Sequence, residues 1–260
     1  MPADTARLAA RAPAGLGTVS SDAPIGPWRA EVVIPAHRIV LALLRDEIVE
    51  VRGSTDAGTF AAYRGLPNAV HGMIAWPNTV LLTGVEPIVI DPGYQTQGDM
   101  LVGALTARAL ASDDIRTVVM THLHSDHLSA VPQLGDVELI VHEAELDTPY
   151  ARRQHGLLDA VAVRVLTGDR GDIRPGLGWI HTPGHTPGHI AVIADCQDGR
   201  VIVAGDTLGP DPGWFDRMDL PTGFPDRDAH LEAFRRIRAL DPDVVIPGHN
   251  PPVRLREHGT

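Results

Sequence analysis

The chain has 260 residues, a formal net charge of −11 and one cysteine, Cys196. A chain of this length can bury one substantial core. Its net negative charge argues against nucleic acid as a partner, because nucleic-acid-binding proteins usually have a basic face. All 22 basic residues are arginine, which excludes a lysine Schiff base and a lysine-dependent phosphate loop. A single cysteine cannot form an intrachain disulfide. These properties favour a soluble domain and argue against nucleic acid as its main partner.

The N-terminal region differs in composition from the rest of the chain. Residues 1–28 are rich in Ala, Pro, Gly and Ser and are predicted to form a flexible arm ahead of a single domain at 29–260. No sustained apolar run is present there, so neither a signal peptide nor a membrane span is predicted, and a cytoplasmic location is expected. Apolar clusters at 32–34 and 39–44 predict strands at a sheet edge.

The next segments predict alternating strands and helices. Apolar runs at 79–82 and 88–90 predict paired strands that end in the turn Asp91-Pro92-Gly93. Asp91 therefore lies at a strand end, where a turn-forming role competes with a role in orienting a metal-binding histidine from behind. Residues 99–110 have the spacing of an amphipathic helix that leads into a strand at 118–120, which is typical of α/β layering.

The second half continues this pattern. A short helix is predicted at 128–134 and a longer one at about 228–240. Strands are predicted at 138–141, 161–166, 179–180, 190–194, 201–204 and 244–246. Two stacked sheets flanked by helices fit this order best.

A histidine-rich segment follows the strand at 118–120. Thr121-His122-Leu123-His124-Ser125-Asp126-His127 places three histidines and a carboxylate at the end of an apolar strand. Such groups lose hydration when buried, and a divalent metal compensates them. Side chains two apart in extended backbone point the same way, so His122 and His124 can reach one metal. Asp126 and His127 then face a second position as the chain turns into a helix.

Three later segments supply further candidate ligands in one shared format. His185 lies in the turn Thr182-Pro183-Gly184-His185, Asp206 follows Gly205, and His249 follows Pro247-Gly248. Each comes after a predicted strand and a tight turn. Loops at strand ends on a rigid scaffold commonly carry functional groups.

Taken in order, His-x-His-x-Asp-His, Pro-Gly-His-Thr, Gly-Asp and Pro-Gly-His resemble the motifs of the metallo-β-lactamase superfamily over roughly residues 75–250. The resemblance implies an α/β fold of the αββα sandwich type, with a dinuclear site at the sheet edges. It also implies that His122, His124 and His185 bind the first metal, that Asp126, His127 and His249 bind the second, and that Asp206 bridges them.

The donor types bear on the metal and the reaction. Zinc suits a histidine-rich set without thiolate, and the carboxylates leave manganese and iron as alternatives. Two divalent ions about 3.5–4 Å apart would lower the pKa of a bridging water. The resulting hydroxide, oriented by Asp126, is expected to attack an ester, lactone or thioester carbonyl. A mononuclear iron sulfur dioxygenase and a β-lactamase or phosphotriesterase-type hydrolase are the alternatives.

Other residues near these motifs have less certain roles. His189 competes with His185 in the repeated Thr-Pro-Gly-His, and motif position favours His185 as the ligand, with His181 and His189 behind it. Gly209 stands where acyl-homoserine lactonases, which share this repeat, have a tyrosine. Three aromatic residues after Asp206 predict either a loop anchored by its own hydrophobic cluster or an apolar wall for the substrate. These aromatic residues are Trp214, Phe215 and Phe224.

Overall fold

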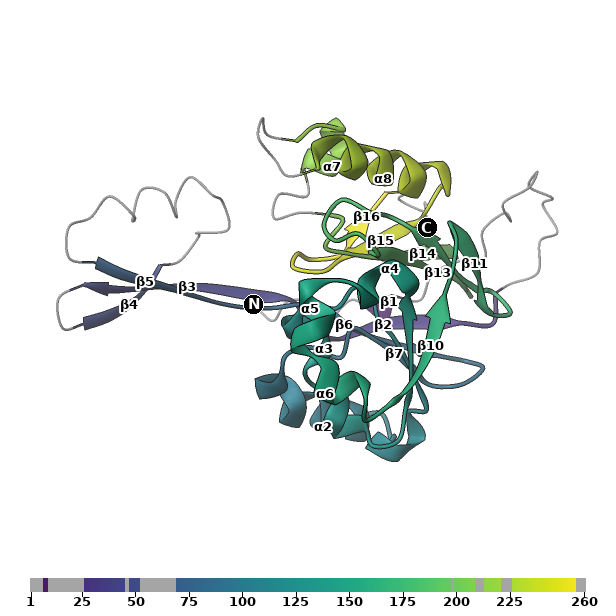
Figure 1. Ribbon diagram of the computed structural model, residues 1–260, viewed down its shortest axis with the longest axis horizontal. Coiled ribbons are helices and arrows are strands. Elements are labelled where there is room, and N and C mark those ends of the chain that lie inside the picture. The colour runs from purple at the N-terminus through teal and green to yellow at the C-terminus, as the bar shows by residue number, and fades with distance from the viewer. Residues whose placement is uncertain are drawn as a thin grey trace.

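The computed structural model describes residues 7–8, 26–44, 47–51, 69–197, 199–208, 213–220 and 226–255. In this part of the chain two large sheets lie face to face and a smaller sheet extends to one side (Figure 1). No helix within these ranges is long and apolar enough to cross a membrane.

The first large sheet has seven strands in the order β1-β2-β6-β7-β8-β9-β10. Neighbours from β1 to β7 are antiparallel, whereas β7, β8, β9 and β10 run parallel. The strand bounds are β1 Arg7–Leu8, β2 Arg29–Ile34, β6 Thr79–Thr83, β7 Ile88–Ile90, β8 Thr117–Val119, β9 Glu138–His142 and β10 Ala162–Leu166.

The second large sheet has six strands in the order β11 to β16. All its neighbours are antiparallel except β14 and β15, which are parallel. The bounds are β11 Arg170–Arg174, β12 Leu177–His181, β13 Ile190–Cys196, β14 Gly199–Gly205, β15 Val244–Pro247 and β16 Val253–Arg254. The edge strands β11 and β16 were not predicted.

Helices cover the outer face of each sheet, which gives four layers (Figure 1). Helices α7 (Gly213–Arg217) and α8 (Arg227–Ala239) lie on the second sheet. The helices of the first half are η1 Gln95–Gln97, α2 Gly98–Thr106, η2 Ser112–Asp114, α3 Ser125–Leu128, η3 Val131–Leu134, α4 Glu143–Leu146, α5 Pro149–Arg153 and α6 His155–Leu158. The helix predicted at 128–134 is divided into α3 and η3.

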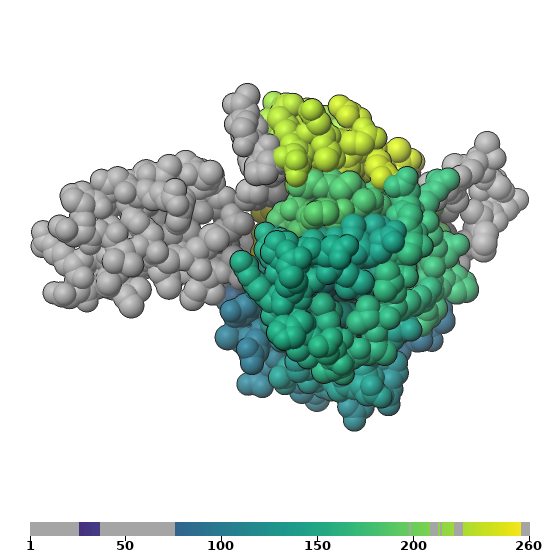
Figure 2. Space-filling model, in the orientation of Figure 1, coloured from purple at the N-terminus to yellow at the C-terminus, as the bar shows by residue number. Residues whose placement is uncertain are grey.

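Three hydrophobic clusters fill the spaces between the four layers, because side chains alternate across each strand. Val80 and Leu82 belong to the cluster between the two sheets, whereas Leu81 belongs to the cluster under the first set of helices. Likewise Val192 faces the first sheet and Ile193 faces α8. The space-filling view shows the first half of the domain (blue to teal) in contact with the second half (green to yellow) (Figure 2). The predicted αββα sandwich is therefore confirmed.

The N-terminal boundary of the packed domain differs from the sequence prediction. Trp28, assigned to the flexible arm, is fully buried between the sheets, and its Nε1–H donates to the Pro175 carbonyl at 2.9 Å. Composition alone hides this contact because its partner lies 147 residues away. The packed domain therefore includes Trp28.

The apolar clusters at 32–34 and 39–44 belong to different sheets. The first lies in β2, but the second lies in β3 (His37–Leu44), which pairs with β4 (Glu47–Val51) and β5 (Ala69–Trp76). These three strands form the small sheet beside the sandwich (Figure 1). The turn-rich segment 53–67 lies outside the described residues.

Replacing Trp28 tests this boundary. Because the indole is fully buried and hydrogen-bonded, Trp28→Ala is expected to lower the free energy of unfolding by about 3–5 kcal/mol in urea denaturation. Val85→Ala, at a residue 56% exposed, should change it by less than about 0.5 kcal/mol. Equal effects of the two substitutions would contradict the packing of Trp28.

Candidate metal centre

The candidate ligands lie in loops that follow strands of both large sheets. His122, His124, Asp126 and His127 come after β8, and Asp91 follows the parallel neighbour β7. Asp206 follows β14, His249 follows its parallel neighbour β15, and His185 lies between β12 and β13. Since parallel strands end at the same edge of a sheet, these loops meet where the two sheet edges face each other.

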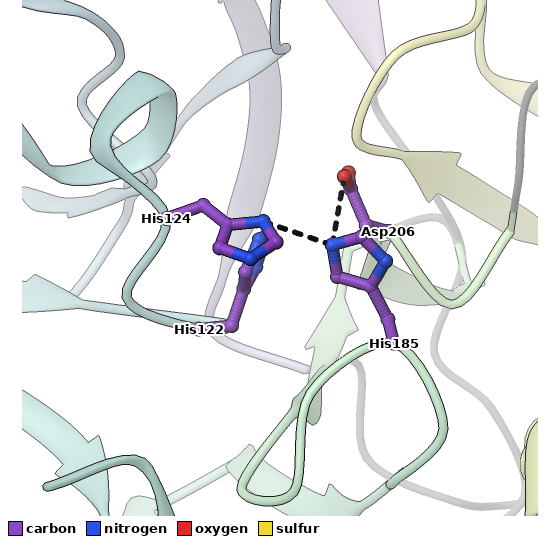
Figure 3. A group of neighbouring side chains, drawn as sticks. All are labelled: His122, His124, His185 and Asp206. Carbon is purple, nitrogen blue, oxygen red and sulfur yellow. Dashed lines mark hydrogen bonds and ion pairs between the residues drawn. The ribbon is translucent and has the colours of Figure 1, made fainter. Parts of the chain in front are cut away.

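Four side chains form what we call the first ligand group: His122, His124, His185 and Asp206. One potential ligand atom from each lies within 4.8 Å of the others, and Figure 3 shows the four converging from opposite sides. His185 Nε2 is 3.0 Å from His124 Nδ1 and 3.3 Å from Asp206 Oδ2. Ligands held at about 2.1 Å by a tetrahedral zinc ion lie about 3.4 Å apart, so these spacings suit a metal.

Three more side chains form the second ligand group: Asp126, His127 and His249. His249 Nε2 is 3.1 Å from Asp126 Oδ2, and His127 Nε2 is 3.9 Å from the same oxygen. Asp206 contacts this group too, since its Oδ1 is 3.4 Å from His127 Nε2 and its Oδ2 is 3.5 Å from His249 Nε2. Asp206 therefore lies between the two groups, and His124 and His127 belong to different groups.

Several ligand atoms are buried without a hydrogen-bond partner among the described residues. They include Nε2 of His122, Nε2 of His127 and Oδ1 of Asp206. Buried polar atoms normally have partners, because an unmet donor or acceptor keeps its full desolvation cost. Lone pairs from several imidazoles and a carboxylate directed at common points fit divalent cations. The side chains present therefore fit the metals that the motifs imply.

Asp91 fixes the imidazole orientation in both groups. Its Oδ2 accepts from His127 Nδ1–H at 2.9 Å and from the Thr121 hydroxyl at 2.6 Å. Because the Thr121 proton is directed at Asp91, Thr121 Oγ1 accepts from His122 Nδ1–H at 3.0 Å. His122 then directs an unprotonated Nε2 at the site, and His127 does so in its neutral form. This matches the orienting role considered for Asp91 from the sequence.

His189 lies behind Asp206. The Asp206 backbone N–H donates to His189 Nε2 at 3.1 Å, which places the imidazole proton on Nδ1, 2.9 Å from Thr182 Oγ1. Gly205 makes this approach possible, since a Cβ there would lie 2.8 Å from His189 Nε2 and its φ is 48°. His185 belongs to the first ligand group and His189 does not.

Within the described part of the chain, the side-chain contacts of His181 do not include a candidate ligand. Its Nε2–H donates to the Pro187 carbonyl at 2.7 Å, and its ring stacks on His142 with centroids 4.3 Å apart. Pro187 lies in the loop that carries His185, so the hydrogen bond from His181 stabilises the position of that loop.

The predicted aromatic wall is wrong for Phe215. Its side chain is 1% exposed and packs edge-to-face on Phe234 of α8, with ring centroids 5.4 Å apart. Phe215 packs on α8 because α7 and α8 lie on the same face of the second sheet. This packing is the other alternative given by the sequence, a loop anchored by its own hydrophobic cluster. Phe224 and the Trp214 side chain lie outside the described part of the chain.

Two residues at the site were not predicted. The Tyr150 ring on α5 contacts His124 edge-on, with centroids 4.1 Å apart, and is 36% exposed. Glu145 on α4 is fully buried and accepts hydrogen bonds from two ligand-bearing loops. No local pattern signals either role, because both depend on a helix folding back over the loop after β8.

The charge states follow from burial and from neighbouring charges. Burial lowers the pKa of His122 well below its usual value and lowers that of His185 to about 4. Burial also opposes ionisation of His127 and Asp206, but their mutual attraction outweighs it. The pKa of His127 is raised well above its usual value and that of Asp206 is lowered well below. A bound metal must therefore displace the His127 proton.

Comparison with known proteins agrees with this geometry. A model of the metallo-beta-lactamase superfamily matches residues 77–249. Probable metallo-hydrolase YflN of Bacillus subtilis is 27% identical over 213 residues, 64% of this chain and 76% of the relative. Metallo-beta-lactamase domain-containing protein 1 of Xenopus laevis is 30% identical over 217 residues, 75% of this chain and 85% of the relative.

Solved structures share the fold. A quorum-quenching N-acyl homoserine lactone hydrolase matches with a TM-score of 0.61 at 19% identity, over 88% of this chain and 93% of its own. The segment matched by the superfamily model contains both ligand groups and most of both large sheets. The chain therefore belongs to the metallo-beta-lactamase superfamily.

The lowered histidine pKa values predict acid sensitivity of the metal-free protein. Unfolded histidines take up protons near pH 6.5, whereas folded His122 and His185 do not, so acidification favours the unfolded chain. His127 does not offset this, because below pH 6.5 it is protonated in both states. The free energy of unfolding should fall between pH 6.5 and about 4, with His185 contributing at most about 3 kcal/mol.

Urea denaturation of chelator-treated protein across this range is the measurement. His185→Ala should give a shallower slope, since the group responsible for part of the proton uptake is gone. A stability that does not change between pH 6.5 and 4.5 would contradict the buried neutral state of these imidazoles.

Proposed function

We propose that this metal-dependent hydrolase uses two divalent cations to cleave an ester, lactone or thioester bond in a small molecule. The observation that carries the proposal is the position of Asp206, whose carboxylate lies 3.3 Å from His185 in the first ligand group and 3.4 Å from His127 in the second. A carboxylate shared in this way suits two neighbouring ions better than one.

The donor set supports zinc. The two groups offer imidazole nitrogens and carboxylate oxygens, and the single cysteine, Cys196, is buried in the core between the sheets. Zinc accepts such mixed nitrogen and oxygen ligands in tetrahedral geometry, with manganese and iron as alternatives. His122, His124 and His185 would hold the first ion, Asp126, His127 and His249 the second, and Asp206 both.

Two bound cations would supply a water of lowered pKa and would polarise the substrate carbonyl oxygen. Asp126 is the most exposed member of the second ligand group, with a side chain 31% exposed. Although burial opposes its ionisation, the hydrogen bond with His249 keeps the pKa of Asp126 below its usual value. An ionised Asp126 open to solvent can accept a hydrogen bond from the attacking water and orient it.

The substrate class is supported by likeness and by the residues at the site. The N-acyl homoserine lactone hydrolase that shares the fold acts on a lactone, as its name says. Tyr150 is the exposed aromatic residue beside the first ligand group, in contact with His124. We assign Tyr150 to the contact with the non-reacting part of the substrate, a role that Phe215 cannot take because it is buried against α8.

A sulfur dioxygenase with one iron is a second candidate. The first ligand group alone supplies three imidazoles and a carboxylate, which contains the two-histidine, one-carboxylate set that non-haem iron enzymes use. Metal analysis of protein purified without added metal separates the two candidates. One iron per chain favours the dioxygenase, and two zinc or manganese ions favour the hydrolase.

Metal removal tests the hydrolase proposal. Complete chelation should abolish hydrolysis in a screen of lactones, aryl esters, thioesters and phosphotriesters, and added zinc should restore it, because the proposed nucleophile depends on the cations. Asp126→Ala should lower kcat by about 100-fold or more while the fold is kept. Hydrolysis that survives complete demetallation would sink the proposal.

The role of Tyr150 has its own test. Tyr150→Ala should raise KM for the best substrate about tenfold with a smaller change in kcat, because it removes a contact made before and during the reaction alike. Met100→Ala removes another exposed side chain, 48% exposed on α2, and serves as the control. A KM that is unchanged by Tyr150→Ala would remove Tyr150 from the substrate site.

A further inference from the structure

Glu145 is a buried acidic residue outside both ligand groups. It lies on α4 and its side chain is fully excluded from solvent. Among the described residues it has no ion pair with an arginine or histidine, and its two carboxylate oxygens accept backbone hydrogen bonds instead. Oε2 accepts from the Leu123 N–H at 3.0 Å, and Oε1 accepts from the Gly188 N–H at 2.9 Å.

The two donors belong to the two loops that carry the histidines of the first ligand group. Leu123 lies between His122 and His124 in the chain, and Gly188 is three residues after His185. One loop comes from the first large sheet and the other from the second. A single carboxylate therefore connects the loops that carry all three histidines. No hydrogen bond described for Glu145 reaches the loop that carries His249.

The backbone of Glu145 is itself fixed on both sides. His142 caps the start of α4, accepting from the Ala144 N–H at 3.2 Å. The Glu145 carbonyl accepts from the Thr148 hydroxyl at 2.7 Å. Gly188 packs directly on this turn, since a Cβ at Gly188 would lie 2.4 Å from the Glu145 nitrogen. The carboxylate is therefore held at a defined distance from both loops.

Both carboxylate oxygens must act as acceptors here, because both face an N–H. A glutamine side chain would offer one acceptor oxygen and one NH₂ group. The NH₂ group would then lie opposite the N–H of Leu123 or Gly188, and two donors cannot form a hydrogen bond. A buried carboxylate also costs free energy unless it is hydrogen-bonded or near positive charge. The Leu123 and Gly188 N–H groups supply these hydrogen bonds.

We propose that Glu145 is a positioning residue for the first metal site, setting the separation of the loop with His122 and His124 from the loop with His185. The inference rests on the proposed function in one respect, that the first ligand group binds a metal. It predicts that the affinity of the first site depends on the Glu145 carboxylate, whereas that of the second site does not.

Zinc binding in single-site backgrounds tests this inference without any activity measurement. His249→Ala keeps the first ligand group intact, and His124→Ala keeps the second. Each chelator-treated protein is titrated with zinc against a competing chromophoric chelator, with and without Glu145→Gln. Glu145→Gln should weaken zinc binding about 10–100-fold in the His249→Ala background and less than about threefold in the His124→Ala background.

Two further variants separate positioning from a general loss of structure. Glu143→Gln removes the same charge from the same helix and should leave both affinities unchanged. Glu143 is exposed and accepts from the Gly168 N–H at 3.3 Å, outside both ligand-bearing loops. Gly188→Ala keeps the carboxylate but forces α4 away from the loop, and should weaken the first site alone. It provides the test should Glu145→Gln fail to fold.

The outcomes are distinct. Equal weakening in both backgrounds, or no weakening of the first site by either Glu145→Gln or Gly188→Ala, would overturn the positioning role while the two-metal proposal stands. If His249→Ala itself binds no zinc although His124→Ala does, the first ligand group is not a zinc site and the inference falls with it. If neither background binds zinc, the proposed function also fails.

Discussion

The position of the Asp206 carboxylate constrains every other part of this site. Its two oxygens lie within about 3.5 Å of histidines from both ligand groups, so the loops after β8, β14 and β15 and the loop between β12 and β13 must all converge on one point. The strand after which Asp206 lies cannot supply that convergence alone. The convergence of these loops requires two sheets whose edges lie side by side. The four-layer packing holds the edges in that position at this end of the molecule.

Backbone hydrogen bonds connect the two sheets beside the site. The Ile190 N–H at the start of β13 donates to the Thr121 carbonyl at 2.9 Å. The Asn78 side chain donates to the Pro247 and Asn250 carbonyls, each at 2.7 Å, and so holds both sides of the loop that carries His249. Glu145 adds a third connection. Each of these hydrogen bonds involves a main-chain atom of a ligand-bearing loop, so it fixes the position of the loop and leaves the imidazole and carboxylate groups of the candidate ligands available for a metal.

The polar groups around the ligands divide into two kinds with different effects. Asp91 and Thr121 bind the Nδ1 atoms of His127 and His122 and thereby decide which nitrogen faces the site. His189 and Glu145 bind backbone N–H groups and decide where a ligand-bearing loop lies. The first kind decides which imidazole nitrogen carries the proton, and the second decides how far apart the candidate ligands lie. Metal affinity depends on both, because a ligand must be deprotonated and within bonding reach at once.

Much of this architecture can be predicted from local sequence. Short continuous apolar runs identify most core strands, and His185, Asp206 and His249 each follow a strand and a tight turn. The separation of His124 from His127 follows from a chain that changes from extended to helical between them. These features depend on neighbours a few residues apart, which is the range over which backbone geometry is set.

Other features depend on contacts between distant segments, and only the tertiary structure decides them. Trp28 is buried because the two large sheets pack against each other around it, and Phe215 is buried because α8 lies over the same face of the second sheet. Tyr150 and Glu145 reach the site because α4 and α5 fold back over the loop after β8. The spacing of apolar residues along the chain does not predict these contacts, because they form only when complete layers pack against each other. Local sequence predicts the candidate ligands and their order, because each belongs to a short motif, whereas the packing of the layers decides which distant residues support the loops that carry them.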